Sequence, residues 1–458
     1  MAKAVLQALS VAVIGGGWAG CAAAMELARA GHAVTVYEAA RTLGGRARKV
    51  EREAQDKLTV LDNGQHILLG AYTETLRLLK LSGQDPSDVI LDLPLQMRYP
   101  DGSGGMDFIA PRWPAPLHLA WALLRATGLG RADKVALMRF SSAMRWMGWQ
   151  LYNDCTVSEL LERFDQTDRL IQLMWRPLCL AALNTPPERA SAKVFVNVLH
   201  DSLGARRRRA SDMLIPKTNL SALFPEAAAR YVESHGGQLK LGAKVVSLQA
   251  LPDGRWQLNR AATHDRVVLA TSSSQAASLL ASVGDPAVEG VVAQLQAFAF
   301  EAISTCYLQY DTAVRLDLPF YALVDAPEQA HWGQFVFDRG QLDARQAGLL
   351  AVVISASGRA AAQGHEALAQ AVAAQLAQVL RMPQLAQPAW TQVITEKRAT
   401  FACTPDLPRP ANATGLPGLV LAGDYTTGDY PATIEAAVRS GVQAAALVCQ
   451  INTPATKA

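Results

Sequence analysis

Long hydrophobic segments and an excess of one charge are both missing from this sequence of 458 residues. No run of about 18 or more apolar residues occurs, so we do not expect a membrane-spanning helix. The 43 Lys and Arg residues nearly balance the 40 Asp and Glu residues, which gives a formal charge of +3. Such a balance gives no basic domain of the kind that binds nucleic acid, so no nucleic-acid partner is expected.

Cysteine is scarce and scattered. The six cysteines form no C-x-x-C pair, and this spacing is not typical of a disulfide framework or a zinc site. We therefore expect no metal and a cytoplasmic protein. The N-terminus also lacks a basic region followed by an apolar run and a cleavage site, so no secretory signal is expected.

Glycines, in contrast, are concentrated near the N-terminus. The short apolar run 10–14 is typical of a buried parallel strand, and Gly15, Gly17 and Gly20 follow it as G-x-G-x-x-G where a helix begins. In a dinucleotide-binding turn the first glycine permits the sharp bend. The second lets the backbone approach a pyrophosphate, and the third lets the helix lie close to the strand. The alternative is a structural turn with incidental glycines.

An acidic residue ends the next expected strand, 33–37. Glu38 stands 18 residues after Gly20, where a carboxylate can accept hydrogen bonds from ribose hydroxyls. Because a carboxylate repels a 2′-phosphate, NADP is disfavoured at this site. Together, strand, glycine turn, helix and acid predict dinucleotide binding.

A second glycine turn, Leu43–Arg48 (LGGRAR), resembles the second phosphate motif of the flavin amine oxidase and phytoene desaturase superfamily. The resemblance implies that the cofactor is FAD and that Gly45 and Arg46 contact it. The guanidinium of Arg46 can form a two-pronged hydrogen bond with a phosphate, which Lys cannot reproduce. The alternative is that Arg46 and Arg48 form a solvated loop pair.

Three further segments match this superfamily. The turn 62–66 (DNGQH) lies beside the flavin in the superfamily, which implies a cofactor contact for Gly64. In the superfamily the strand expected at 238–248 supplies backbone contacts to adenine through a valine. Here that residue is Val245 or Val246, and we take Val246 as the candidate. Near the C-terminus, cofactor contacts are implied for Gly423, Asp424, Thr433 and Ile434. There Asp424 would bind the ribityl or pyrophosphate side, and a helix starting near Pro431 would direct N–H groups at the flavin.

Two segments in the middle of the chain, 116–130 and 134–152, are expected to form helices rich in Trp, Met and Leu with interspersed arginines. Such helices suit a membrane interface, where arginines extend toward lipid headgroups. The alternative is a helical cap on a substrate domain. The four arginines at 206–209 form a solvated face or contact anionic headgroups. Peripheral contact with the inner face of a membrane is therefore a hypothesis.

The fold class predicted is α/β: a Rossmann-like FAD-binding domain with an inserted α+β substrate domain. The FAD-binding domain is expected to comprise residues 1–92, 213–290 and 397–458. The substrate domain is expected to comprise residues 93–212, including the helical cap, and 291–396.

Longer stretches narrow the resemblance to the hydroxysqualene dehydroxylases, the squalene-associated FAD-dependent family of bacterial hopanoid synthesis. They are GGGWAG, DNGQHILLGAYTETL, WRPLCLAALNTPPE and GDYTTGDYPATIEAAVRSG. One departure is Tyr425, where the family commonly has tryptophan. The resemblance implies a C30 isoprenoid substrate, reductive conversion of hydroxysqualene to squalene, and upstream prenyl synthases as partners.

This reaction needs an acid for the leaving hydroxyl, a long apolar cavity and hydride from reduced flavin. His66, Asp62 and Tyr430 are the candidate proton donors, although a structural role fits each of them; for His66 this is a hydrogen-bonding turn residue. The sequence has no second nucleotide motif, so NADPH and a reductase both stay open as electron donors.

Three other functions share this resemblance. A carotenoid or phytoene-type desaturase would remove hydride instead of adding it. An amine oxidase usually carries a lysine near the flavin in the middle of the chain, but no lysine occurs between Lys244 and Lys397. The last alternative is a non-catalytic flavin-bound partner of a prenyl synthase.

Overall fold

Five parallel strands bring the two ends of the chain together. The computed structural model describes residues 8–54 and 57–450, so the outermost residues of the first and last predicted domain segments lie outside the described residues. The sheet has the order β10-β2-β1-β14-β20, and every neighbouring pair is parallel. Its strands are Gln238–Leu241 (β10), Ala33–Glu38 (β2), Ser10–Ile14 (β1), Arg266–Leu269 (β14) and Leu419–Leu421 (β20).

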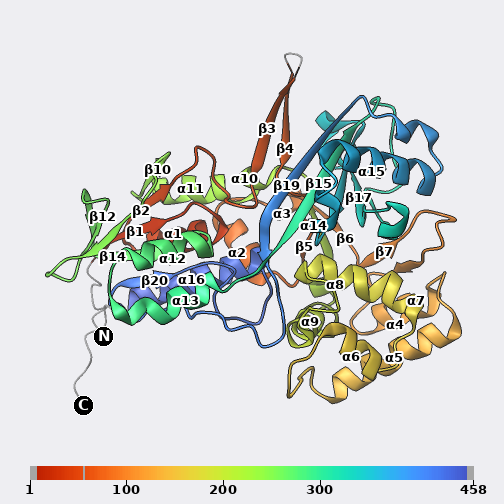
Figure 1. Cartoon of the computed structure of the whole chain (residues 1–458), viewed down its shortest axis with the longest axis horizontal. Helices are drawn as coiled ribbons and strands as arrows, with labels where there is room; N and C mark the ends of the chain where they lie inside the picture. Colours follow the sequence, from red (N-terminus) through yellow and green to blue (C-terminus); the bar gives the residue numbers. More distant parts are fainter. Residues whose placement is uncertain (1–7, 55–56, 451–458) are drawn as a thin grey trace.

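Helices cover both faces of this sheet (Figure 1). Val11 and Val13 of β1 belong to the core with α1 (Trp18–Arg29) and α16 (Ile434–Gln450). Alternate residues of the same strand face the other side, where α12 (Ser273–Ala281) contributes to the core. Because side chains alternate along a strand, burial on both faces explains the continuous apolar runs in the sequence.

A second sheet is antiparallel, in the order β16-β17-β18-β15-β19. Helix α15 (His365–Val379) covers one of its faces, while Phe335, Phe337 and Ile303 on the other face line a cavity. The strands are Phe320–Ala322 (β16), Phe335–Asp338 (β17), Leu349–Ile354 (β18), Phe300–Gln309 (β15) and Trp390–Phe401 (β19).

Helices inserted before this sheet lie against the same cavity, at the end of the molecule farthest from β1 and β2 in Figure 1. They include α4 (Leu117–Arg125), α5 (Arg131–Trp146), α8 (Arg176–Leu183) and α9 (Ala192–Leu199). Both helices expected at 116–152 form, but they are shorter than expected. Helix α5 ends at Trp146 because Gly148 and Trp149 adopt positive φ angles of 63° and 58°.

The predicted fold class is confirmed: a parallel α/β nucleotide-type sheet is interrupted by an antiparallel sheet with its own helices. Two local details differ. The strand before β4 (Lys57–Asp62), β3 (Lys49–Ala54), was not expected. The helix expected at 220–235 is divided before Pro225. Within the described ranges, no helix combines the length and the hydropathy that crossing a bilayer requires.

A buried carboxylate ties α16 to the N-terminal part of the chain. Glu435 is fully buried and accepts hydrogen bonds from the backbone N–H and the hydroxyl of Thr75, at 2.9 and 2.7 Å. Thr75 lies in the first turn of α2 (Thr73–Leu81), and Arg439 pairs with the other oxygen of Glu435 at 2.7 Å. A carboxylate that accepts hydrogen bonds from the N–H groups at a helix N-terminus stabilises that helix and its contact with the rest of the fold.

Replacing this carboxylate by an amide should destabilise the fold. We expect Glu435→Gln to lower the free energy of unfolding by about 1–3 kcal/mol, because the charge-assisted bonds to Thr75 and Arg439 are lost. Denaturant unfolding measures this change. The matched control is Glu366→Gln, an exposed acid in the first turn of α15, which should change stability by less than about 0.5 kcal/mol. Equal effects of the two variants would contradict the role given to Glu435.

Candidate active site

The first glycine turn has the close contacts that its sequence predicts. Gly15 has a φ of +112°, and a Cβ on it would collide with the carbonyl oxygen of Ala270 in the neighbouring chain segment. A Cβ on Gly20 would collide with the carbonyl oxygen of Gly15. Any side chain at these two positions would therefore force α1 away from the sheet.

Glu38 is fixed at the end of β2. Its Oε2 accepts a hydrogen bond from the backbone N–H of Gly16 at 2.6 Å, and its Oε1 accepts one from Ala40 at 2.7 Å. The residue lines the same cavity as Gly15 and Gly17. The carboxylate thus lies beside the glycine turn, where a ribose of a dinucleotide would sit.

The two glycine turns contact each other. The backbone N–H of Gly44 donates to Gly16 at 2.9 Å, and Gly45 approaches Gly17 so closely that a Cβ on Gly45 would lie 3.2 Å from the Cα of Gly17. Both turns line the cavity. They therefore form one continuous backbone wall of the kind that accommodates a pyrophosphate.

Arg46 joins this wall to the C-terminal part of the chain. Its Nη2 pairs with Asp424 at 2.5 Å, and its Nη1 donates to the carbonyl of Ala399 at 2.8 Å. Gly423 and Asp424, which follow β20, line the cavity with Arg46. The side chains predicted to bind the phosphate and ribityl parts of FAD are therefore adjacent, although they are distant in sequence.

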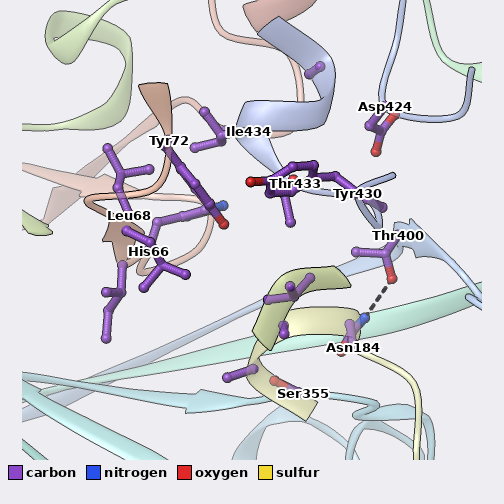
Figure 2. Close-up of a pocket in the computed structure, with 18 of the residues that line it drawn as sticks. His66, Leu68, Tyr72, Asn184, Ser355, Thr400, Asp424, Tyr430, Thr433 and Ile434 are labelled. Atoms are coloured by element: carbon purple, nitrogen blue, oxygen red, sulfur yellow. Dashed lines mark hydrogen bonds between the residues drawn. The ribbon is translucent and has the colours of Figure 1, made fainter. Parts of the chain in front are cut away.

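The start of α16 also faces the cavity. The helix begins at Ile434 and not near Pro431, and the Thr433 hydroxyl accepts a hydrogen bond from the N–H of Ala436 at 3.2 Å. This capping moves the helix start three residues later than predicted. Thr433 and Ile434 both line the cavity (Figure 2).

The turn after β4 places His66 and Gly64 in the cavity wall but not Asp62. The Asp62 carboxylate is buried and accepts a hydrogen bond from the N–H of Leu220 at 2.7 Å. Burial raises its pKa to about 6, against the opposing effect of Arg339. Its position gives Asp62 a structural role and no support as a proton donor, because its carboxylate is turned to the protein interior.

His66 presents a free nitrogen. Its Nδ1 lies 2.7 Å from the carbonyl oxygen of Gly64; since a carbonyl can only accept, Nδ1 carries the proton. Burial lowers the pKa of the ring, so the neutral form is favoured. Neutral His66 therefore offers Nε2 as a hydrogen-bond acceptor, and this nitrogen carries no proton to donate.

Tyr430 also lines the cavity. Its hydroxyl donates to Asp201 at 2.6 Å, and burial together with this carboxylate raises the pKa of the phenol. His200 is exposed and lies with its Nδ1 3.1 Å from the other oxygen of Asp201. The three side chains therefore form a polar connection between the cavity wall and the surface.

The structure separates the two candidate valines. Val246 is exposed and does not line the cavity, whereas Val245 is buried and does. Both lie between β10 and β11 (Leu248–Ala250), and the predicted backbone contact of Val246 with adenine stays a prediction. The resemblance alone could not distinguish the two valines.

Two functional positions were missed from sequence. Arg409 donates to the carbonyls of Asp424 and Tyr430 at 2.7 and 2.8 Å and so fixes the loop that carries both residues. Asn184, within WRPLCLAALNTPPE, donates to the Thr400 hydroxyl at 2.9 Å (Figure 2). Both act across long sequence separations, and only the helix-ending position of Asn184 gave a local signal.

Most of these groups line one cavity of about 900 Å³. Its polar lining includes the two glycine turns, Glu38, Arg46, Asp424, Gly64, His66 and Thr433. The rest of the lining is mainly apolar and includes Met174, Trp175, Phe195, Leu199, Phe335 and Phe337. The backbone wall of the glycine turns fits the pyrophosphate of FAD, the Glu38 carboxylate fits the ribose of its adenosine, and the start of α16 fits the flavin. The apolar part of the cavity is left for a second molecule.

Comparison with known proteins gives one family. The model of the flavin containing amine oxidoreductase family matches residues 18–449. A hydroxysqualene dehydroxylase of Rhodopseudomonas palustris is 30% identical over 456 residues, covering 96% of this chain and 98% of that protein. A zeta-carotene desaturase of Arabidopsis thaliana is 24% identical, covering 96% of this chain and 85% of that protein.

Solved structures show the same fold at lower identity. Cyclohexylamine oxidase from Brevibacterium oxydans IH-35A has a TM-score of 0.67 and 18% sequence identity, with 97% of this chain and 99% of that chain covered. At this identity the similarity supports the architecture described above.

Replacing the guanidinium group of Arg46 should weaken FAD binding. We expect Arg46→Lys to raise the Kd for FAD about tenfold, because an ammonium cannot keep both the Asp424 and the phosphate contact. Titration of the apoprotein with FAD, followed by flavin fluorescence, measures the Kd. Arg41→Lys, an exposed site outside the cavity lining, is the control and should leave it unchanged. Wild-type affinity in Arg46→Lys would contradict the assignment.

Asp62 should make stability depend on pH. Because the pKa of Asp62 is raised from 3.8 to about 6, its stabilising contribution is complete below pH 3.8 and is lost as the pH rises through about 6. Relative to Asp62→Asn, the wild type should lose on the order of 2–3 kcal/mol between about pH 4 and about pH 7. Denaturant unfolding across this range tests it, with exposed Asp317→Asn as control. Parallel pH profiles for wild type and Asp62→Asn would refute the account.

Proposed function

The chain belongs to the flavin containing amine oxidoreductase family and is an FAD-dependent oxidoreductase, and we propose that it reduces hydroxysqualene to squalene. The main support is the single cavity that joins the FAD residues to an apolar chamber. Its similarity over nearly the full chain to a hydroxysqualene dehydroxylase agrees with this assignment.

The reaction balances with one hydride and one proton. The allylic C–O bond breaks, the hydroxyl leaves as water after taking a proton, and the carbon receives a hydride. Bound FAD, in its reduced form, supplies that hydride. The protein has to bind the chain, orient the hydroxyl, deliver the proton and keep water from the cationic carbon.

The apolar chamber performs the binding and the exclusion of water. Aromatic side chains from two elements line it: Phe195 of α9, and Phe335 and Phe337 of β17. Trp175 closes one wall, where its ring lies 4.7 Å from that of Phe140. Such a lining matches a long hydrocarbon and offers few groups that could trap a carbocation.

The proton comes from Tyr430. Its hydroxyl is joined through the Asp201 carboxylate to His200, so a proton given to the substrate can be replaced along this connection. His200, exposed at the other end, returns the proton from solvent. His66 accepts a hydrogen bond at Nε2 and so orients the substrate hydroxyl. The role given to His66 follows from which of its two nitrogens already carries the proton.

A carotenoid-type desaturase is the second candidate, because a zeta-carotene desaturase is similar over 96% of this chain. In that direction neutral His66 would act as a base. The predicted contact with upstream prenyl synthases stays a prediction in either case.

Turnover under anaerobic conditions distinguishes the candidates. The FAD-loaded enzyme, reduced with dithionite in D2O, should convert hydroxysqualene to squalene that is one mass unit heavier, since the hydride position on flavin exchanges with solvent. Mass spectrometry reports the product. Squalene or phytoene consumed with a quinone acceptor, and no squalene formed from hydroxysqualene, would establish the desaturase instead.

Removing the Tyr430 hydroxyl should abolish most of this turnover. We expect Tyr430→Phe to lower the rate by about 10²–10⁴, as for loss of a general acid, with an unchanged flavin absorption spectrum. The matched control is Tyr310→Phe, which removes a similar buried hydrogen bond, to Leu385, outside the cavity. Wild-type turnover in Tyr430→Phe would exclude this tyrosine as the donor.

A further inference from the structure

Large apolar side chains are exposed together on one face of the inserted helices. Nine of them lie between residues 109 and 152, and we call their surface the α4–α5 face. Trp146 is 91% exposed and Leu124 67% exposed. The set comprises Ile109, Trp113, Leu117, Trp121, Leu124, Val135, Met138, Trp146 and Tyr152.

The opposite sides of the same helices are apolar as well. Leu123 of α4 and Leu137 and Phe140 of α5 are buried and line the cavity. Large apolar side chains that are exposed together and lie next to polar residues mark an interaction site. A helical cap on the substrate domain, the alternative to a membrane interface, explains the apolar side chains that line the cavity. It does not explain the large apolar side chains on the exposed side of α4 and α5.

Positive charge is interspersed with these apolar residues. Arg125, Arg131, Arg139 and Arg145 are exposed, and none of them forms an ion pair with a described residue. The guanidinium of Arg125 lies 5.2 Å from the centre of the Trp121 ring. Arginine next to interfacial tryptophan is the pattern of a surface that meets lipid headgroups.

The arginine run 206–209 lies beside this face. A Cβ on Gly204 would lie 2.9 Å from the Trp149 ring, just after α5. On the other side of the run, Ser211 is 3.2 Å from the Nε2 of His118 in α4. Arg206, Arg207 and Arg209 are exposed, so they add to the positive charge around the ends of α4 and α5.

The cavity opens on the same face. Five residues in or next to α4 and α5 line the cavity and are also exposed at the surface. They are Pro116, Ala120, Met138, Ser142 and Arg145. In Figure 1, α4 and α5 lie at the opposite end of the molecule from β1 and β2.

We propose that the α4–α5 face docks on an anionic lipid surface and places the opening of the cavity against the bilayer. Exposed tryptophan and leucine enter the headgroup region, and the arginines pair with anionic headgroups. A second copy of this chain fits less well, because a symmetric contact would bring the same unpaired arginines together. The inference concerns binding alone and does not need the proposed reaction.

Vesicle co-sedimentation of the FAD-loaded full chain tests the proposal. We expect binding to vesicles of phosphatidylglycerol and phosphatidylethanolamine, weaker binding to pure phosphatidylcholine, and loss of binding as salt rises. The double variant Leu124→Ser/Trp146→Ser should bind about tenfold more weakly or less. Arg139→Gln/Arg206→Gln should weaken binding to the anionic vesicles while leaving phosphatidylcholine binding unchanged.

Matched controls come from the rest of the surface. Leu58→Ser, on the β3–β4 hairpin, and Arg230→Gln, on α11 (Pro225–Ser234), remove an exposed leucine and an exposed arginine elsewhere and should bind as the wild type does. The proposal is overturned if the double variant binds like the wild type, or if the wild type binds neither kind of vesicle. A dimer in solution that the Leu124→Ser/Trp146→Ser change dissociates, without vesicle binding, would assign the face to a second copy.

Discussion

The ion pair between Arg46 and Asp424 joins residues that are 378 positions apart, and the site depends on it. Arg46 belongs to the second glycine turn, and Asp424 follows the last strand of the parallel sheet. Because β20 lies beside β14, which lies beside β1, this arrangement brings both turns and the start of α16 to one edge of the sheet. Carboxyl ends of parallel strands are where such folds bind nucleotides.

The inserted segments have a different task. Their sheet presents one face to α15 and the other to the cavity, and the helices α4, α5, α8 and α9 complete the enclosure. Helices α4 and α5 carry apolar side chains toward the cavity and also on their exposed side. In the proposed function, substrate binding and lipid contact would use these two sides of the same helices.

Local patterns predicted much of the fold. The run 10–14, the glycine turn and Glu38 gave β1, α1 and the end of β2, because strand, turn and helix signals lie within one short segment. Contacts between distant residues could not be predicted in this way. The carboxylate of Asp62 accepts a hydrogen bond from the backbone N–H of Leu220, and Arg409 donates to backbone carbonyls of the loop 424–430. Because these partners are distant in sequence, no local pattern marks either role. Of the neighbouring valines, Val245 lines the cavity and Val246 does not, and a resemblance between sequences could not tell which of the two does.

A crystal structure of the FAD-loaded enzyme with hydroxysqualene tests the central claim most directly. The account predicts a flavin ring between Gly64 and Thr433, with the carbon chain along Phe195 and Phe337 and its hydroxyl near Tyr430. A flavin held elsewhere, or a hydrocarbon bound outside the chamber with Tyr430 facing only protein, would contradict it.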